Sequence, residues 1–403
     1  MLVRALGDIE LAEESVQDAF ATALARWPAD GVPSSPEGWI ITTARNRAID
    51  RVRRDAKLPE RYAQAELLHG AGTEAGPAGA DPGSDAVLDA ISTTPDSIPD
   101  ERLRLIFTCC HPALSMPARV ALTLRLLGGL ETAAIARSFL TSETTMAQRL
   151  VRAKRKIRDA RIPYRVPSGD DLPERLDGVL TVVYLIFNAG HTAGEGTELA
   201  REDLRKEAIR LGRLLARLLP DEPEVGGLLA LMLLVDSRSA ARVDEDGRIV
   251  LLADQDRGRW DRASIVEAHT LLRRSIWYGR IGAYQLQAAI QAVHGAATSF
   301  ADTDWPQIVR LYDQLLLVTR NPVVALNRAV AVAEVDGPET GLRLVDELDL
   351  GGYYLFHAVR ADLLRRLERT EDATAAYRQA LELTENEPER AFLRSRLNQL
   401  VTS

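Results

Sequence analysis

The stretch Thr123–Arg161 reads TLRLLGGLETAAIARSFLTSETTMAQRLVRAKRKIRDAR, and it predicts a helix, a tight turn and a second helix crowded with positive charge. From Glu143 to Arg161 there are seven Lys or Arg residues against two acids. At helical spacing one side of this second helix is apolar, consisting of Met146, Leu150, Ala153 and Ile157. We expect this side to pack on the preceding helix, Thr132 to Phe139, and the other side to meet DNA in a major groove.

The polar side of the second helix carries residue types that hold duplex DNA. Thr and Gln near the helix start can reach base edges, and the basic residues that follow can contact phosphates. Ser142 stands where its hydroxyl would cap the helix. A merely solvated charged face is the alternative, and the capped turn argues against it. The predicted DNA-binding residues are Thr144, Thr145, Gln148, Arg149, Arg152, Lys154 and Lys156.

Length and composition favour a soluble, cytoplasmic protein of two or three domains, and the helical patterns along the chain predict an all-α fold. The chain has 403 residues, of which 46% are hydrophobic, and no apolar run is long enough for a membrane span or a signal peptide. Its two cysteines, Cys109 and Cys110, exclude a disulfide framework. A metal site with His111 is the alternative, but helical neighbours diverge by about 100°. Buried thiols are the favoured interpretation, and we expect no metal and no cofactor.

The formal net charge of −8 is unevenly spread. A second basic segment, Arg45 to Lys57, holds six basic residues against two acids, inside a predicted helix that starts at Pro36. Two basic helices in an acidic chain suggest two contacts with one nucleic acid. The apolar side of this helix is predicted to be Ile41, Ala44, Ala48, Ile49 and Val52. The helix before it, from about Asp8 to Trp27, is expected to bury Leu11, Val16, Ala19, Phe20 and Leu24.

The order of these elements resembles a bacterial RNA polymerase sigma factor of the extracytoplasmic-function (ECF) class. The resemblance covers roughly residues 1–165 and rests on an acidic helix ending in Trp27, a Trp39 motif with Asn46 and Asp50, and the closing sequence LVRAKRKIR. It implies sigma region 2 at residues 1–60, a flexible acidic linker at 61–100 and a region 4 helix-turn-helix at 101–165. The implied partners are the core polymerase and promoter DNA.

The resemblance also implies roles for individual side chains. The helix Leu11 to Trp27 would clamp the polymerase large subunit through Glu14, Gln17 and Asp18. The proximal promoter element would be contacted by Asn46, Arg47, Asp50, Arg51 and Arg54, with Asn46 meeting an unstacked base. Thr144 to Arg152 would read the distal element. Most of the family's usual first helix is missing before Leu2, so we expect either a start codon assigned late or a shortened domain.

Between the two basic helices, Glu66 to Asp100 is rich in Gly, Ala, Pro and acids and is expected to be flexible. It is either a simple tether or, by resemblance, a segment that threads the polymerase channel later used by RNA.

From Pro163 onward the sequence predicts long helices and, near the end, a repeat. Helical periods cover Val179–Phe187, Leu204–Leu219, Gly227–Val235, Ser264–Trp277, Tyr284–Thr298, Trp305–Thr319 and Pro322–Val335. A tetratricopeptide pattern, whose period is about 34 residues, is matched by Ala361, Leu364, Leu367, Ala373, Tyr377, Ala380, Leu381 and Pro388. Residues 172–403 are therefore expected to stack as an α-solenoid. The segments FNAGH, GLLALMLL and DQDRGRWD resemble an ECF subgroup with such an extension.

Two loops of this extension concentrate polar residues. One holds Asp254, Asp256, Arg257, Trp260 and Asp261, and the other holds His191 and Glu195. Helix caps and structural packing are favoured over catalysis for these residues, and a site for a protein or small-molecule partner stays open.

Two functional hypotheses follow from the whole sequence. The leading one is a non-enzymatic sigma factor regulated through its own extension. The alternative is a helix-turn-helix regulator with a helical sensor domain that works without core polymerase.

Overall fold

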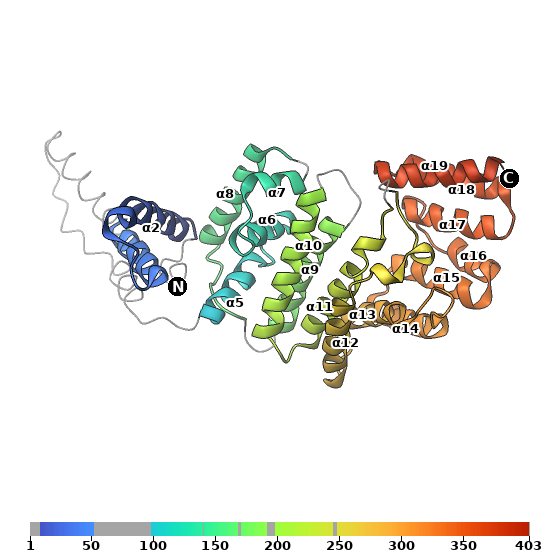
Figure 1. The fold of residues 1–403 in the computed structure, drawn as a ribbon, viewed down its shortest axis with the longest axis horizontal. Helices are drawn as coiled ribbons and strands as arrows, with labels where there is room; N and C mark the ends of the chain where they lie inside the picture. Colours follow the sequence, from blue (N-terminus) through green and yellow to red (C-terminus); the bar gives the residue numbers. More distant parts are fainter. Residues whose placement is uncertain are drawn as a thin grey trace, which may run out of the picture. The chain divides into compact units, whose positions relative to one another are not determined.

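The computed structural model describes residues 9–51, 98–139, 141–167, 171–191, 198–244 and 248–402. Within these ranges the regular structure is helical, apart from one isolated antiparallel bridge between Val243 and Ile249, so the predicted all-α class is confirmed there (Figure 1). The chain divides into two compact units, residues 1–135 with 142–179 and residues 136–141 with 180–403. Most of the expected linker, Arg54 and the loop with Glu195 lie outside the described residues.

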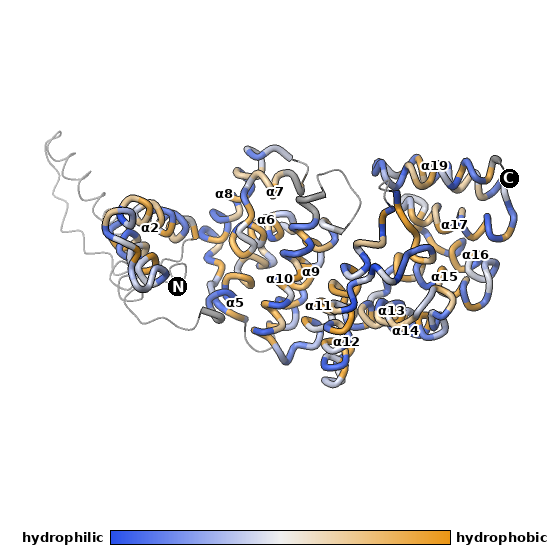
Figure 2. Tube along the Cα trace, viewed as in Figure 1, coloured by the Kyte–Doolittle hydropathy of each residue, from blue (hydrophilic) through white to orange (hydrophobic). Residues whose placement is uncertain are grey.

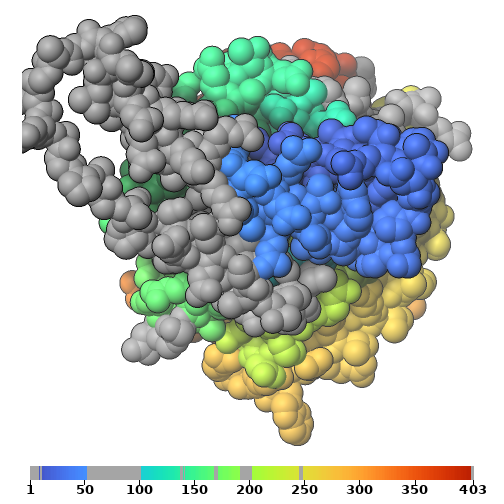
Figure 3. Space-filling view, turned by 90° about the vertical axis from the view of Figure 1, so that its left-hand side faces the viewer, coloured from blue at the N-terminus to red at the C-terminus, as the bar shows by residue number. Residues whose placement is uncertain are grey.

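The first unit begins with an N-terminal helix pair, α2 (Ile9–Asp30) and a helix over 36–51, which forms the compact blue block of Figure 3. Small residues on both helices let them approach closely. The pair's core consists of Ala19, Ala23, Ile40 and Ala44, with Val16, Trp27 and Trp39 packed at its edge.

For three residues of this pair, the prediction that the side chain is buried is wrong. Phe20 and Leu24 are 54% and 78% exposed, and Ile41 is 40% exposed. The buried side of α2 instead follows the small residues Ala12, Ser15, Ala19 and Ala23. When two neighbouring arcs of a helix both carry apolar residues, hydrophobic periodicity alone does not distinguish which arc faces the partner helix.

The helix-turn-helix module follows, with α5 (Ile98–Cys109), α6 (Met116–Leu126), α7 (Thr132–Ser138) and α8 (Glu143–Asp159). Helix α6 packs against both α5 and α8. Fully buried side chains in this module include Phe107, Leu122, Leu124, Ile135 and Met146. The module also holds the start of α9 (Asp171–His191), because Arg175 donates from Nη2 to the Phe107 carbonyl over 2.8 Å.

The second unit is a succession of helices that pack mainly on their neighbours in the sequence. Each helical period predicted beyond Pro163 coincides with a helix. The helices are α10 (Glu198–Leu218), α11 (Pro223–Asp236), α12 (Arg262–Trp277), α13 (Ala283–Ala296), α14 (Trp305–Thr319), α15 (Pro322–Asp336), α16 (Pro338–Asp346), α17 (Tyr354–Arg366), α18 (Thr370–Leu383) and α19 (Glu387–Thr402).

Helix α11 is the centre of this unit's first part. It is apolar on nearly all sides, as Figure 2 shows, and it is buried from Gly227 through Leu234. Helices α10, α12 and α13 all pack on it. Gly227 is required for this packing, because a Cβ there would lie 2.7 Å from the Gln285 backbone nitrogen.

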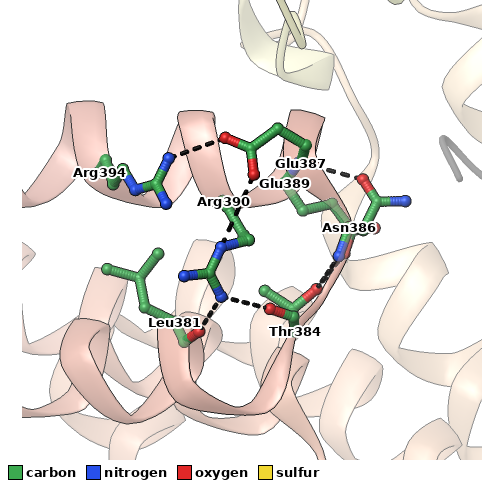
Figure 4. Close-up of polar contacts among 7 residues, drawn as sticks. All are labelled: Leu381, Thr384, Asn386, Glu387, Glu389, Arg390 and Arg394. Atoms are coloured by element: carbon green, nitrogen blue, oxygen red, sulfur yellow. Dashed lines mark hydrogen bonds and ion pairs between the residues drawn. The ribbon is translucent and has the colours of Figure 1, made fainter. Parts of the chain in front are cut away.

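At the carboxyl end of the chain, Arg390 ties α19 to the end of α18. Its Nη1 donates to the carbonyls of Leu381 and Thr384, each at 2.7 Å, and Glu387 lies 3.8 Å from its Nε (Figure 4). A guanidinium thus satisfies carbonyls that the end of α18 leaves without helical partners.

Across the described ranges, none of the helices combines the length and apolar content needed to cross a bilayer.

Candidate nucleic-acid interface

Helix α8 is built as the sequence predicts. Ser142 adopts an extended conformation and its Oγ accepts from the Thr145 amide at 3.2 Å, so the predicted cap is confirmed. The buried stripe consists of Met146, Leu150, Ala153 and Ile157, which was predicted in full. Helix α6 covers this stripe. The opposite side of α8 is therefore left to solvent.

Most of the predicted distal-element residues lie on that open side. Thr144, Thr145, Gln148, Arg152 and Lys156 are exposed, and Arg149 is half-buried. Gln148 accepts from Arg152 at 3.3 Å, which holds the two long side chains side by side. The Thr145 hydroxyl lies 2.8 Å from Ser142 Oγ.

Four of these residues share one hollow. Thr145, Arg149, Arg152 and Lys156 line a depression of about 430 Å³, whose other wall is the segment from Ala113 to Ala118 before and within α6. Three cations around one concave surface form a site suited to an anionic strand. Sequence patterns gave no sign of the second wall, because it contributes small and apolar residues from about thirty positions earlier in the chain.

Lys154 differs from the other predicted residues. Its Nζ lies 2.5 Å from Glu13, and Arg125 lies 3.4 Å from the same carboxylate. The Lys154 side chain is only 14% exposed. It could contact DNA only after the pair with Glu13 opens, and this contact between segments far apart in the sequence was not predicted.

The helix over 36–51 displays the predicted proximal-element residues. Asn46, Arg47, Asp50 and Arg51 are all exposed, while Ala44 and Ala48 are buried beneath them. Arg51 forms an ion pair with Glu14 of α2 at 2.6 Å. Two residues predicted for different partners, DNA and polymerase, are therefore in contact with each other.

The predicted polymerase-binding residues lie on the outer side of α2. Gln17 and Asp18 are exposed and Glu14 is half-buried. The exposed Phe20 and Leu24 extend the same helix surface. An acidic patch bordered by two large apolar side chains is the composition of a protein-binding surface rather than of a purely solvated one.

The adjacent cysteines are buried and free, as predicted. Burial raises the pKa of the Cys110 thiol to about 11, and Thr123 Oγ1 lies 3.6 Å from its Sγ. Burial also raises the pKa of Cys109. Both thiols thus stay protonated near neutral pH, whereas metal ligation requires thiolates.

Comparisons with known proteins agree with this geometry. Residues 1–58 match the family Sigma-70 region 2, residues 104–157 match Sigma-70, region 4, and residues 175–276 match a family of unknown function (DUF6596). The ECF RNA polymerase sigma factor SigK of Mycobacterium tuberculosis (strain ATCC 25618 / H37Rv) is 30% identical over 163 residues, covering 40% of this chain and 76% of SigK.

The chain belongs to the ECF sigma factor family. SigK of Mycobacterium ulcerans (strain Agy99) is 29% identical over the same length. An uncharacterized protein of Rhizobium meliloti (strain 1021) is 42% identical over 404 residues, covering 99% of this sigma factor and 92% of that protein. The sigma factor is therefore a non-enzymatic transcription initiation protein that carries regions 2 and 4 and a helical DUF6596 extension.

Proposed function

We propose that this sigma factor holds one promoter at two places through two separate cationic surfaces. The distal element is bound by Thr144, Thr145, Gln148, Arg149, Arg152, Lys154 and Lys156, and the proximal element by Asn46, Arg47, Asp50, Arg51 and Arg54. The observation that carries the proposal is the hollow on α8, where Thr145, Arg149, Arg152 and Lys156 converge. A capped helix whose opposite side is buried presents these side chains in a fixed orientation.

The proximal surface is proposed to act on opened DNA. Opening a duplex requires compensation for lost stacking, which a protein supplies by holding an extruded base beside a basic track. Asn46 is exposed on a helix whose buried side is locked by Ala44 and Ala48. Arg47 and Arg51 supply the cations beside it.

Core polymerase is proposed to bind α2 through Glu14, Gln17 and Asp18. The ion pair between Glu14 and Arg51 must break when the complex forms, so that Glu14 can contact polymerase and Arg51 can contact DNA. Because that pair is 45–46% exposed, the exchange costs little.

The domain division that we propose is region 2 at 1–60, a linker at 61–100, region 4 at 101–165 and the extension at 172–403. For the extension we propose a tetratricopeptide-like solenoid. Ala361, Ala373, Tyr377 and Ala380 are at most 2% exposed in one continuous core. Ala329 and Gly341 precede Ala361 and Ala373 by 32 residues and form an approximate earlier copy of the repeat. Small residues pack closely there, since a Cβ on Gly341 would lie 2.6 Å from Ala333 Cβ.

The extension is proposed to regulate initiation inside the cytoplasm, in place of a separate inhibitor. The alternative function is a regulator that binds duplex DNA without polymerase. Run-off transcription with purified core enzyme separates the two, because the alternative predicts no initiation. A chain ending at His191 tests regulation: higher activity means that the extension inhibits, and lower activity means that it is required. This endpoint keeps the bond from Arg175 to the Phe107 carbonyl of α5.

A further inference from the structure

The short turns between α11 and α12 bring a group of cationic and aromatic side chains to the end of α13. The turns are η1 (Ser239–Ala241), η2 (Leu252–Asp254) and η3 (Arg257–Arg259). Two carboxylates of this segment act locally, since Asp256 accepts from the Gly258 amide and Asp261 caps α12. The cap at Asp261 was predicted. The buried residues of the segment, Arg257 and Trp260, therefore do not have these acids as partners.

Two guanidinium groups share the Trp260 ring. Arg257 Cζ lies 4.7 Å from the ring centroid and Arg238 Cζ lies 5.7 Å from it. Arg257 Nη1 donates to the carbonyls of His294 at 2.6 Å and Ala297 at 2.7 Å, at the end of α13. Arg238 Nη2 donates to Gln291 Oε1 at 2.7 Å. We name Arg238, Arg257, Trp260 and His294 the arginine cluster.

The arginine cluster concentrates positive charge with no ion-pair partner among the residues that the structure describes. Within the described residues neither Arg238 nor Arg257 makes an ion pair, whereas other arginines of this unit do, such as Arg205 with Asp236 and Arg366 with Glu334. Burial and the nearby Arg242 and Arg257 lower the pKa of Arg238 to about 10. Buried charges without a counter-charge are unfavourable and are normally paired.

One carboxylate lies near enough to favour the charge of Arg257, that of Asp302. It accepts from Thr298 at 2.5 Å and from Ser299 at 2.7 Å and it is exposed, so it is already satisfied elsewhere.

Three polar atoms of the arginine cluster are buried and have no hydrogen-bond partner among the described residues, namely Arg257 Nη2, Trp260 Nε1 and His294 Nδ1. These three residues are 7%, 3% and 7% exposed. A buried donor left unsatisfied is rare in folded proteins and calls for a specific explanation. Here two of the atoms can only donate, and the imidazole nitrogen donates in one tautomer.

Arg390 shows that capping a helix does not by itself leave a guanidinium without a counter-charge. Arg257 and Arg390 bind equivalent carbonyls, because His294 and Leu381 are each three residues before their cap residues, Ala297 and Thr384. Arg390 has Glu387 beside it (Figure 4). Arg257 instead has a second cation, Arg238, over the same Trp260 ring. Helix capping therefore accounts for Arg257 Nη1 but not for Nη2, Arg238 or Trp260 Nε1.

We propose that the arginine cluster is a binding site for an oxyanion group, carboxylate or phosphate, of a small ligand of the extension. The anion supplies the missing counter-charge and accepts from Arg257 Nη2, Trp260 Nε1 and Arg238. Charge-assisted hydrogen bonds from guanidinium groups are the interactions by which proteins recognise both groups. Through this site the extension would bind a ligand of defined chemistry. Binding of the anion does not depend on binding of promoter or polymerase.

The test is thermal unfolding and calorimetric titration of the full chain with inorganic phosphate, sulfate and acetate, with ionic strength held constant by sodium chloride. We expect a saturable rise in Tm with at least one anion. Saturable binding of phosphate and sulfate but not of acetate identifies a tetrahedral anionic group as the ligand, and binding of acetate alone identifies a carboxylate. If none of the three anions binds the full chain saturably, the proposal is overturned.

Variants locate the site. Arg238→Met keeps the unbranched apolar stem of the side chain and removes the guanidinium, and we expect it to weaken anion binding at least about tenfold without lowering Tm in chloride alone. Trp260→Phe keeps an aromatic ring and removes the indole N–H donor, with an expected weakening of about fivefold. Arg390→Met is the matched control: it should lower Tm equally with and without the anion. Anion binding that survives in Arg238→Met, or a loss of Tm in that variant independent of the anion, refutes the site.

Discussion

Trp27 and Trp39 meet edge to face in the N-terminal helix pair, with ring centroids 5.5 Å apart and planes inclined at 64°. Both rings pack against the small core that contains Ala19, Ala23 and Ala44. Because the rest of that core consists mostly of small residues, the two indoles contribute much of its buried apolar area. The pair therefore holds in place the helix that displays Asn46.

Replacing Trp39 should destabilise this helix pair specifically. For Trp39→Ala we expect a loss of about 2–3 kcal/mol, at the lower end for buried aromatic truncations because the ring is half-buried. Hydrogen exchange of peptides from residues 9–51 measures the loss. Trp277→Ala is the control, since that ring is 89% exposed and its removal should change exchange nowhere. Unchanged protection of 9–51 in Trp39→Ala would show that the ring pair is dispensable.

The hollow on α8 predicts a difference between its arginines and others on the same helix. Arg149→Ala and Arg152→Ala should each weaken distal-element binding by about 1–3 kcal/mol if the side chain contacts a base, and should lower the salt slope by about one if it only neutralises phosphate. Arg158, which does not line the hollow, is the control. Titrations of duplex DNA at several salt concentrations distinguish these outcomes. Wild-type affinity in both hollow variants would contradict the recognition-helix assignment.

Asn46 is expected to matter only after the duplex opens. Asn46→Ala should leave duplex binding unchanged and reduce open-complex formation with core enzyme, because its exposed amide is assigned to an unstacked base. Permanganate reactivity of promoter thymines measures opening, and a gel-shift titration measures duplex binding. Equal losses in both measurements would contradict this role.

Glu13 should restrain the free protein. Its carboxylate binds both Lys154 and Arg125, so Glu13→Gln frees two cations of the helix-turn-helix module. We expect distal-element affinity in the absence of polymerase to rise by about threefold, the effect of a partly buried ion pair. Glu14→Gln, which breaks the pair with Arg51, is the control and should leave that affinity unchanged. Lower affinity in Glu13→Gln would mean that the carboxylate instead positions Lys154 for DNA.

Interactions between residues close together in the sequence were predicted correctly, whereas interactions between distant residues were not. The α8 stripe and the caps at Ser142 and Asp261 depend on residues within a few positions, and all were predicted. The exposure of Phe20 and Leu24 depends on which arc of α2 meets the second helix, which periodicity does not fix.

Contacts between distant segments left no sequence signal at all. The arginine cluster joins Arg257 to the end of α13, 37 and 40 residues later in the chain. The sequence analysis named Arg257 and Trp260 in this loop and favoured helix caps for its acids, as Asp256 and Asp261 show, but it did not predict the contact with α13. The Glu13 pair with Lys154 spans 141 residues and was missed for the same reason.

The buried imidazole of the arginine cluster predicts a loss of stability in mild acid. Burial, and then the charges of Arg238 and Arg257, lower the pKa of His294 to about 4, against 6.5 in the unfolded chain. Between these pH values the unfolded state binds more protons, so the stabilisation is complete above pH 6.5 and declines as the pH falls toward 4. From pH 7 to 5 the second unit should lose about 2 kcal/mol through this group.

Thermal unfolding of the full chain in phosphate-free buffers at constant ionic strength measures this slope. His294→Gln removes the titrating group and should flatten the decline between pH 7 and 5, whatever its effect on Tm at pH 7. Burial also lowers the pKa of His111, so the difference between wild type and variant, rather than the total slope, reports on His294. An anion that binds the arginine cluster screens its charge and raises the His294 pKa, so a saturating anion should reduce the wild-type slope and leave the variant unaffected. Identical slopes for wild type and His294→Gln would mean that the imidazole is not held neutral by this cluster.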